Sequence, residues 1–495
     1  MKKTITNSLF IITFFSVLDR ALGFLFKIFM SRTIGAEGVG LYQIAFSFFS
    51  VLLSTVVGGI PLVVSKLVAR SQDSLSQNKI AGSALLLALS ISALLVGLFF
   101  TLYYPLCFAM GKTTLILVIC MLPTLIFSSV YCSLRGFLWG KEKFFAVSIV
   151  EVIEQISRIG ICVAMFLFGF DKLRAVAISL SAGSLVSSIA CFIFFFANHG
   201  KLKSSKSDFL KIAKSSFPIT ISNLIGSLSG SITSLLVPKL FIWSGYTSSQ
   251  ANALLGSSLG MAMPLVFIPI TLVSSLAFVL IPKISNEMKN NDYLKINNSV
   301  VGAIKFATLV ACCLIPIFSA GGRLLCKIVY DNEQSGEFLS FIAFALLPLT
   351  VENITGSILN SLDMEMKNFI NGMIGYSMIW VVALVSIGNY SVYSLGCGFA
   401  LSWTLSAILN IRCIVKKTGL SLSFLPYIIK NLLLCAPTIL LGKNMLQICS
   451  SLHPLLNLSI CSIISVAFFA ILSLVFGSVS FTKISTKRKR KKIKV

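Results

Sequence analysis

The chain has 495 residues, of which 56% are hydrophobic and 12% are charged, and its mean hydropathy is +0.94. Because soluble domains carry about a quarter charged residues, this composition excludes an ordinary soluble protein and predicts a polytopic membrane protein. Lys and Arg (41) outnumber Asp and Glu (16). Such an excess is also typical of nucleic-acid-binding proteins, but its distribution along the chain favours a membrane-topology signal and no nucleic-acid partner.

Apolar runs separated by short polar loops predict about fourteen transmembrane helices. The runs are 8–30, 39–65, 82–106, 113–134, 144–168, 175–197, 212–238, 253–281, 299–319, 338–361, 369–388, 392–411, 424–447 and 454–480. No loop is long enough for a soluble catalytic domain, and the chain has no Gly-x4-Gly-Lys-[Ser/Thr] phosphate loop. We therefore expect an all-α membrane protein that is not an enzyme, with no catalytic residues, metal site or cofactor.

The placement of basic residues predicts the orientation in the membrane. With the N-terminus inside, the inner segments hold about 28 Lys and Arg and the outer segments about 8, which is the bias of the positive-inside rule. We therefore expect both termini in the cytoplasm and the protein in the cytoplasmic membrane. Membrane lipids are expected partners, since the basic tail is suited to contact anionic lipid.

A weak internal repeat predicts two related halves. Residues 58–66 and 276–285 both place Pro and a Lys/Ser pair at an inner membrane edge. We expect two six-helix lobes around a central cavity plus two C-terminal helices, an arrangement suited to alternating access. The expected segments are an N-terminal lobe 1–198, a linker 199–214, a C-terminal lobe 215–418, two added helices 419–481 and a basic tail 482–495.

The first apolar run carries three charges, Asp19, Arg20 and Lys27. Because a charge at the bilayer centre costs roughly 2.5–3.5 kcal/mol on insertion scales, such residues are expected to face a polar interior. Arg20 and Lys27 lie two helical turns apart, on nearly the same face. A cationic stripe there suits a diphosphate or another anion. The alternatives are a structural ion pair with another helix and, for Lys27, a side chain that snorkels outward.

A second group of charges comprises Arg135 and, on the next apolar run, Glu151, Glu154 and Arg158. The last three share one helical face, and Glu154 and Arg158 have the favourable i, i+4 order for an ion pair. One interpretation is structural pairing that fixes the rotation of this helix. The other is substrate binding by the arginines or cation coupling by the acids, for which Glu151 is the better proton carrier because Glu154 is paired.

Glu352 is a single acid in an apolar helix. A lone intramembrane carboxylate is a candidate proton or sodium site, and the alternative is a hydrogen-bonded contact between helices.

Two further sets of residues are candidates for moving parts. Arg32 and Glu37 lie in a glycine-rich turn between the first two helices, which favours tight turning and leaves a role in an outer gate open. Pro264 and Pro269 are expected to kink the eighth helix, with a gating hinge as the sharper hypothesis.

Several short motifs, each weak alone, together carry a family resemblance that covers roughly residues 5–420. They are Asp19 to Phe24, Gly35 to Tyr42, Gly59 to Ala69, Arg135-Gly136, Glu154 to Arg158, Phe217 to Asn223, Gly260 to Pro264 and Ile281 to Ser285. In their order and spacing the chain resembles the multidrug/oligosaccharidyl-lipid/polysaccharide exporter superfamily. It is most similar there to the flippases typified by stage V sporulation protein B.

The resemblance implies fourteen helices and transport of undecaprenyl-diphosphate-linked sugars such as the peptidoglycan precursor lipid II. Arg20 matches a cation of the first helix in the related lipid II flippase, whereas Phe26 stands where a second arginine is expected. The expected function is therefore a flippase for cell-wall, spore-cortex or polysaccharide precursors, monomeric and with cell-wall synthesis proteins as possible partners. Na⁺, H⁺ or the membrane potential would drive it. The alternative is a cation-coupled multidrug antiporter, which needs acids in its cavity.

Overall fold

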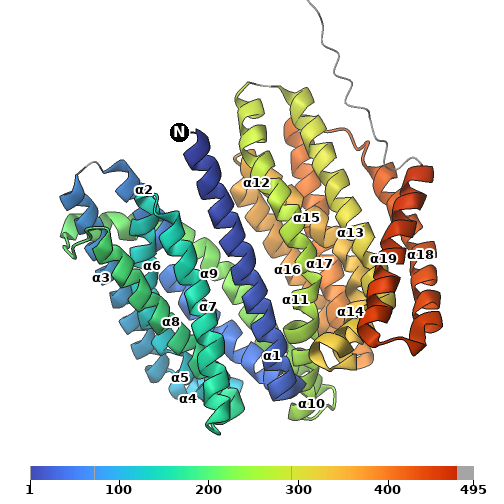
Figure 1. The fold of residues 1–495 in the computed structure, drawn as a ribbon, viewed down its shortest axis with the longest axis horizontal. Coiled ribbons are helices and arrows are strands. Elements are labelled where there is room, and N and C mark those ends of the chain that lie inside the picture. Colours follow the sequence, from blue (N-terminus) through green and yellow to red (C-terminus); the bar gives the residue numbers. More distant parts are fainter. Residues whose placement is uncertain (1, 72, 291, 477–495) are drawn as a thin grey trace, which may run out of the picture. The chain divides into compact units, whose positions relative to one another are not determined.

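The structure is a computed structural model that describes residues 2–71, 73–290 and 292–476 (Figure 1). These residues form helices joined by short turns, and the described chain has no strand. The α-helices are α1 (Lys2–Val57), α2 (Ile60–Arg70), α3 (Ser74–Thr101), α4 (Tyr103–Met110), α5 (Lys112–Met121), α6 (Pro123–Gly140), α7 (Phe144–Leu167), α8 (Lys172–Ala197), α9 (Lys206–Trp243), α10 (Ser248–Leu255), α11 (Met263–Val266), α12 (Ile268–Lys289), α13 (Tyr293–Tyr330), α14 (Glu333–Ile342), α15 (Leu346–Ser361), α16 (Glu365–Tyr390), α17 (Val392–Thr418), α18 (Leu425–Ile448) and α19 (Pro454–Val475). The expected all-α class is confirmed, and the basic tail 482–495 lies outside the described residues.

The number of membrane spans agrees with the prediction. Twelve helical stretches of the described chain are long and apolar enough to cross a membrane. One of them contains two helices that meet at Gly35, and α7 is not among the twelve although it is 24 residues long. The three charges of α7, at positions 151, 154 and 158, account for its absence from that set. With these two corrections the described helices support about fourteen spans.

The turn between the first two spans is a one-residue kink. Helical geometry runs from Lys2 to Val57 except at Gly35, whose φ of 68° and ψ of 179° are accessible almost only to glycine. The glycine-rich turn expected around residues 32–40 is therefore shorter than expected. Gly38 and Gly40 are helical and buried, so they serve packing instead of turning.

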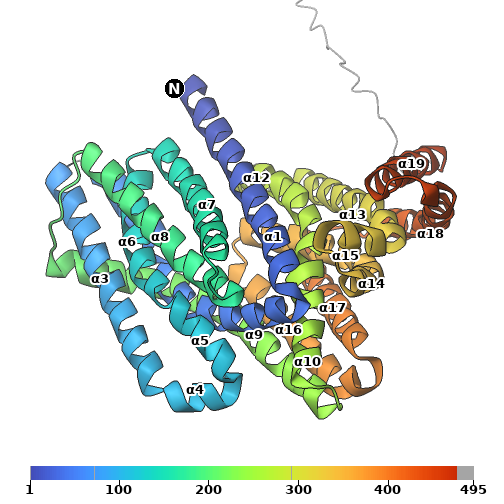
Figure 2. The ribbon, with the colours of Figure 1, turned by 60° about the horizontal axis from the view of Figure 1, so that its bottom comes forward.

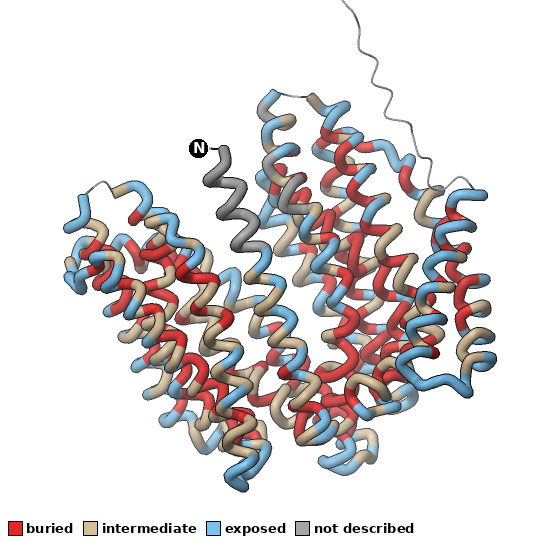
Figure 3. The backbone as a smooth tube through the Cα atoms, in the orientation of Figure 1, coloured by how far each residue is buried: buried red, intermediate tan, exposed pale blue. Residues whose placement is uncertain are grey.

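The described chain packs into two compact units. Unit 1 comprises residues 1–265, 329–338 and 376–398, and unit 2 comprises 266–328, 339–375 and 399–495. Each has its own apolar core, with Phe49, Phe137 and Phe195 fully buried in unit 1 and Ile304 and Phe424 in unit 2. Figure 3 shows buried and exposed turns alternating along the helices, as expected where one face packs and the other is exposed. The division into lobes at residues 199–214 stays a prediction.

Buried hydroxyls join the helices of unit 1. The Ser92 hydroxyl of α3 lies 2.5 Å from that of Ser129 in α6, and the Thr124 hydroxyl of α6 lies 3.0 Å from that of Ser181 in α8. Ser188 of α8 donates to the Phe127 carbonyl at 2.6 Å. Small hydroxyl residues allow close helix approach and supply hydrogen bonds between apolar helices, so α6 is held on both sides.

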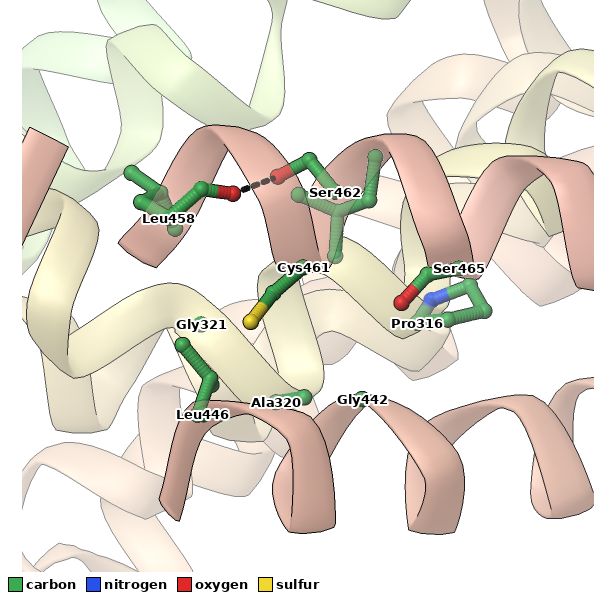
Figure 4. A pocket seen from close by; sticks show the side chains of 10 residues that line it. Pro316, Ala320, Gly321, Gly442, Leu446, Leu458, Cys461, Ser462 and Ser465 are labelled. Carbon is green, nitrogen blue, oxygen red and sulfur yellow. Dashed lines mark hydrogen bonds between the residues drawn. The ribbon is translucent and has the colours of Figure 1, made fainter. Parts of the chain in front are cut away.

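In unit 2, α18 and α19 pack together and against α13 around a small gap (Figure 4). Its volume is about 10 Å³, and small residues line it, among them Ala320, Gly442 and Ser465. A Cβ added to Gly442 would lie 3.1 Å from the Ser465 hydroxyl. Because this space is about the size of one water, the last two helices dock tightly on α13.

In unit 1, α1 packs against α9, α10 and the π-helical turn Gly256–Ala262 that follows α10 (Figure 2). The contact is between backbones. A Cβ at Gly40 would lie 1.9 Å from the Asn252 carbonyl oxygen, and one at Gly256 would lie 1.9 Å from the Ala36 oxygen. Only glycine permits this approach.

We predict that Gly256→Ala destabilises the protein by about 1–3 kcal/mol, the usual cost of overpacking. The added methyl group would have to push the backbones of α1 and the π-helical turn apart. The readout is the melting temperature of the purified full chain in detergent. Gly97→Ala is the matched control, because Gly97 lies within α3 with nothing within 4 Å of an added Cβ. Equal melting temperatures for the two variants would contradict the close approach.

Candidate functional site

Five of the predicted site residues come together in unit 1. They are Asp19 of α1, Arg135 of α6, and Glu151, Glu154 and Arg158 of α7. We call them the charge cluster. The helices that carry them pack against one another, so charges that would be costly alone in hydrocarbon meet in one place.

The first ion pair of the charge cluster joins two helices. Nη2 of Arg135 lies 2.6 Å from Oε1 of Glu151, and each side chain is 25% exposed. The Tyr131 hydroxyl donates to the same carboxylate at 3.3 Å, and the guanidinium carbon lies 4.1 Å from the centre of the Trp139 ring. A cation over an indole face is attracted by the ring quadrupole. Arg135 is therefore fixed by an acid on one side and an aromatic ring on another.

The second ion pair lies within α7. Nη2 of Arg158 donates to Oε1 of Glu154 at 2.7 Å, and the side chains are 17% and 19% exposed. Gly183 of α8 backs this pair, since a Cβ there would lie 3.1 Å from Cβ of Arg158. The pairing expected from the i, i+4 spacing is present, while any role of Arg158 in substrate binding stays a prediction.

Asp19 connects α1 to α7. Its carboxylate is half-buried and lies near enough to Glu154, Arg158 and Arg135 to interact with them electrostatically. Gln155 of α7 also faces α1, since its Nε2 lies 4.0 Å from a Cβ added at Gly23. Sequence reasoning missed Gln155, together with Tyr131 and Trp139. The available signal was that Gln155 sits inside the motif Glu154 to Arg158, on an otherwise apolar helix.

The charge cluster retains hydrogen-bonding capacity. Nε of Arg135, Nε of Arg158 and Oε1 of Gln155 are buried, and none has a hydrogen-bond partner among the described residues. An unpaired buried N–H is costly. Two cationic donors are thus available to a water or an anion.

Arg20 and Lys27 lie outside the charge cluster. Both side chains are exposed, and neither forms a hydrogen bond or ion pair with a described residue. Both belong to α1, as does the half-buried Asp19. Whether they form the cationic stripe expected to face a polar interior stays a prediction. The helix carries two cations that the described protein does not neutralise.

A polar groove runs between the second half of α1 and α9. It has a volume of about 590 Å³, and Ser50, Ser54, Gly58, Asn223 and Ser227 are among its lining residues. The Asn223 amide donates to the Gly58 carbonyl at 2.9 Å, where α1 ends and α2 begins. Hydroxyl and amide groups of this kind are suited to hydrogen-bond the hydroxyls of a sugar.

Arg32 and Glu37 lie beside the Gly35 kink. At a rise of 1.5 Å per residue, the kink is about 24 Å along α1 from Asp19. Nε of Arg32 donates to the Val329 carbonyl at 2.8 Å. The Ser249 hydroxyl donates to Glu37 at 2.7 Å. These two residues are not part of the charge cluster.

Glu352 belongs to unit 2, in α15. It is half-buried, and its carboxylate has no hydrogen-bonding or ion-pairing partner among the described side chains. The next residue, Asn353, accepts a hydrogen bond from Ser274 of α12 at 3.2 Å. The helix–helix hydrogen bond that was the alternative role for Glu352 is thus made by its neighbour, Asn353.

Pro264 lies in α11, and Pro269 lies in the first turn of α12 after a break at Phe267. The chain passes from unit 1 to unit 2 between residues 265 and 266, hence between these two prolines. A hinge at this point stays a prediction. No group of three His, Cys, Asp or Glu side chains in the described chain is placed to hold a metal ion.

The sequence of the chain is similar to those of known proteins. The model of the polysaccharide biosynthesis protein family matches residues 5–288, more than half of the chain. The chain is 25% identical to stage V sporulation protein B of Bacillus subtilis (strain 168) over 451 residues, covering 85% of this chain and 87% of that protein.

Two solved structures share the fold. The lipid II flippase MurJ in an inward closed conformation superposes with a TM-score of 0.73 at 16% identity, covering 94% of this chain and 98% of that one. An inward-facing multidrug resistance MATE family transporter of the MOP superfamily superposes with a TM-score of 0.68 at 14% identity, covering 81% and 94%. The predicted resemblance to stage V sporulation protein B is confirmed by the sequence, and the superpositions show the fold of the flippase and MATE structures.

We predict that Arg135→Met lowers the free energy of unfolding by up to about 3–5 kcal/mol, because it leaves Glu151 without its cation. The double variant Arg135→Met/Glu151→Met is expected to regain much of this loss, since no charge is then unpaired. Thermal unfolding of the purified chain measures both. Arg174→Met is the control, because Arg174 and Asp171 are 60% and 61% exposed at 3.9 Å. Additive effects of the two cluster substitutions would show that the pair is not coupled.

Proposed function

Because the chain belongs to the polysaccharide biosynthesis protein family, we propose that it is a flippase for an undecaprenyl-diphosphate-linked sugar. The substrate is a precursor of peptidoglycan, spore cortex or another polysaccharide. The observation that carries the proposal is the pair Arg20 and Lys27, two exposed cations on α1 without a neutralising partner among the described residues. The names of two similar proteins, stage V sporulation protein B and lipid II flippase MurJ, support the substrate class.

The chemistry of the substrate explains why such cations are needed. A diphosphate does not cross hydrocarbon unaided, because burying its charge is costly. Arg20 and Lys27 replace part of its water by charge-assisted hydrogen bonds, and the hydroxyl-lined groove between α1 and α9 suits the sugar. The polyprenyl chain stays in lipid. No covalent step is involved, so the protein acts as a transporter.

Alternating access completes the mechanism. With both termini in the cytoplasm, Arg20 meets the head group from the inner side, and the Gly35 kink lies toward the outer side. Movement between the two units at residues 264–269 then exposes the head group to the opposite leaflet. Glu352 is the proposed coupling group, since an unpartnered half-buried carboxylate in an apolar helix is suited to take up H⁺ or Na⁺.

A cation-coupled multidrug antiporter is the second candidate. The observation in its favour is the likeness to the MATE fold, which comes with the unpartnered acid Glu352. The acids of the charge cluster do not add to it, because Glu151 and Glu154 are held by arginines.

We predict that Arg20→Ala reduces flipping at least tenfold, because one charge-assisted hydrogen bond is worth about 1.5–3 kcal/mol. The measurement is transfer of a labelled undecaprenyl-diphosphate sugar across proteoliposomes, with and without an imposed membrane potential. Arg174→Ala is the control, since Arg174 is an exposed arginine at the start of α8. If the wild-type protein moved ethidium and none of these lipids, the antiporter would replace the flippase.

We further predict that Glu352→Gln abolishes the response of transport to an imposed pH or Na⁺ gradient, because the neutral amide cannot exchange a cation. Binding of the lipid substrate should be retained. Glu365→Gln provides the control, since Glu365 is exposed in the first turn of α16. An unchanged gradient response in the Glu352 variant would assign coupling to another group or to the membrane potential.

A further inference from the structure

A pocket distinct from the charge cluster lies in unit 1, beside the Gly35 kink of α1. Its volume is about 370 Å³, and its walls come from α1, α9, α10 and the junction between α4 and α5. Seven polar residues line it, namely Glu37, Lys112, Thr113, Thr114, Lys239, Ser248 and Asn252. We call this the lysine pocket.

The charge of the lysine pocket favours an anion. Lys112 and Lys239 are exposed, and no described residue pairs with either of them. Glu37 is the one acid that lines the pocket, and its carboxylate accepts the Ser249 hydroxyl at 2.7 Å. Two cations against one engaged carboxylate leave a positive excess.

The N-terminus of α5 adds donors to the same wall. Lys112 and Thr113 begin this ten-residue helix, and the N-cap residue, Gly111, makes no side-chain capping bond. The first N–H groups of a helix lack intrahelical partners. Together with the helix dipole they favour a phosphate at this end.

Asn252 supplies an independent observation. Its side chain is only 8% exposed, it lines the pocket, and its amide has no hydrogen-bond partner among the described residues. Its position is fixed, because the backbone of Gly40 packs directly on its carbonyl group. A side-chain amide that lines a cationic pocket from a fixed backbone position, without a partner among the described residues, is the kind of group that orients a bound oxyanion.

We propose that the lysine pocket binds the diphosphate of the lipid-linked substrate on the exit side, after passage. This assignment rests on the proposed function. Lys112, Lys239 and the N-terminus of α5 neutralise the phosphates, and Asn252 orients them. Glu37 opposes binding and thereby promotes release. A phospholipid head group has the same phosphate chemistry and is the competing source.

The probe is inorganic pyrophosphate, titrated calorimetrically into the purified full chain in phosphate-free detergent. Lys112→Gln and Lys239→Gln should each weaken binding about tenfold, the scale of one charge-assisted hydrogen bond. Glu37→Gln should tighten binding, because it removes the repelling charge. The opposite sign separates a local effect from misfolding.

The matched control is Lys172→Gln. Lys172 is likewise exposed and is the first residue of a helix, α8, but the N-terminus of that helix is capped by the Asp171 carboxylate, which accepts the Arg174 N–H at 2.9 Å. Its pyrophosphate affinity should equal that of the wild type. Absence of pyrophosphate binding, or equal weakening by all three lysine substitutions, would overturn the proposal.

Repeating the titration in phosphatidylglycerol nanodiscs separates the two sources. Retained pyrophosphate binding supports the substrate diphosphate, whereas its displacement would assign the pocket to phospholipid and overturn the exit-side role. Flipping is measured separately with Arg20→Ala. A chain that binds pyrophosphate but flips no lipid would therefore contradict the proposed function and leave the anion site in place.

Discussion

The high free energy of an isolated charge in hydrocarbon is the constraint on which unit 1 depends. α7 carries Glu151, Glu154 and Arg158 on one face within about two turns, and an isolated helix would expose all three to lipid. In the structure, Glu154 is paired with Arg158 of the same helix, and Glu151 is paired with Arg135 of α6. Asp19 then draws α1 to the same point. The rotations of three helices are thus constrained by charge, and hydroxyl contacts join α6 to α3 and α8 as well.

This pairing also separates the charges that are ion-paired from those that are not. Most charges of the cluster are occupied with one another, so they stabilise the contact among α1, α6 and α7. Arg20 and Lys27 lie on the same helix as Asp19, yet they are exposed and unpartnered among the described residues. An anion that enters the protein therefore meets cations that no acid of the described chain has neutralised. Asp19 lies at the contact of α1 with α7, and its neighbour Arg20 is exposed, as the proposed binding of an anion requires.

The sequence was sufficient wherever a property is local. Apolar runs predicted the helices, and the spacing of Glu154 and Arg158 predicted their pair, because both depend on helix periodicity alone. It was insufficient where tertiary packing decides. Arg135 and Glu151 are on different helices, so their contact depends on how α6 meets α7. The break at Gly58 and the π-helical turn 256–262 look like ordinary glycine-containing helix in the sequence, and the turn expected around residues 32–40 is only a one-residue kink at Gly35. The lysine pocket gathers residues from four parts of the chain, and no single motif contains them.

The fold itself does not decide the substrate. The chain superposes on a lipid II flippase and on a multidrug transporter with similar TM-scores, 0.73 and 0.68, so both functions are compatible with the same helices. What distinguishes them is the sign of the charge left unpaired. A carrier of cationic drugs needs an acid open to its ligand. Glu151 and Glu154 are ion-paired, whereas Glu352, a half-buried acid of α15 in unit 2, lacks a partner among the described side chains. The exposed charges Arg20 and Lys27 of α1, which have no partner among the described residues, are both cationic, and this sign matches the diphosphate of the proposed substrate.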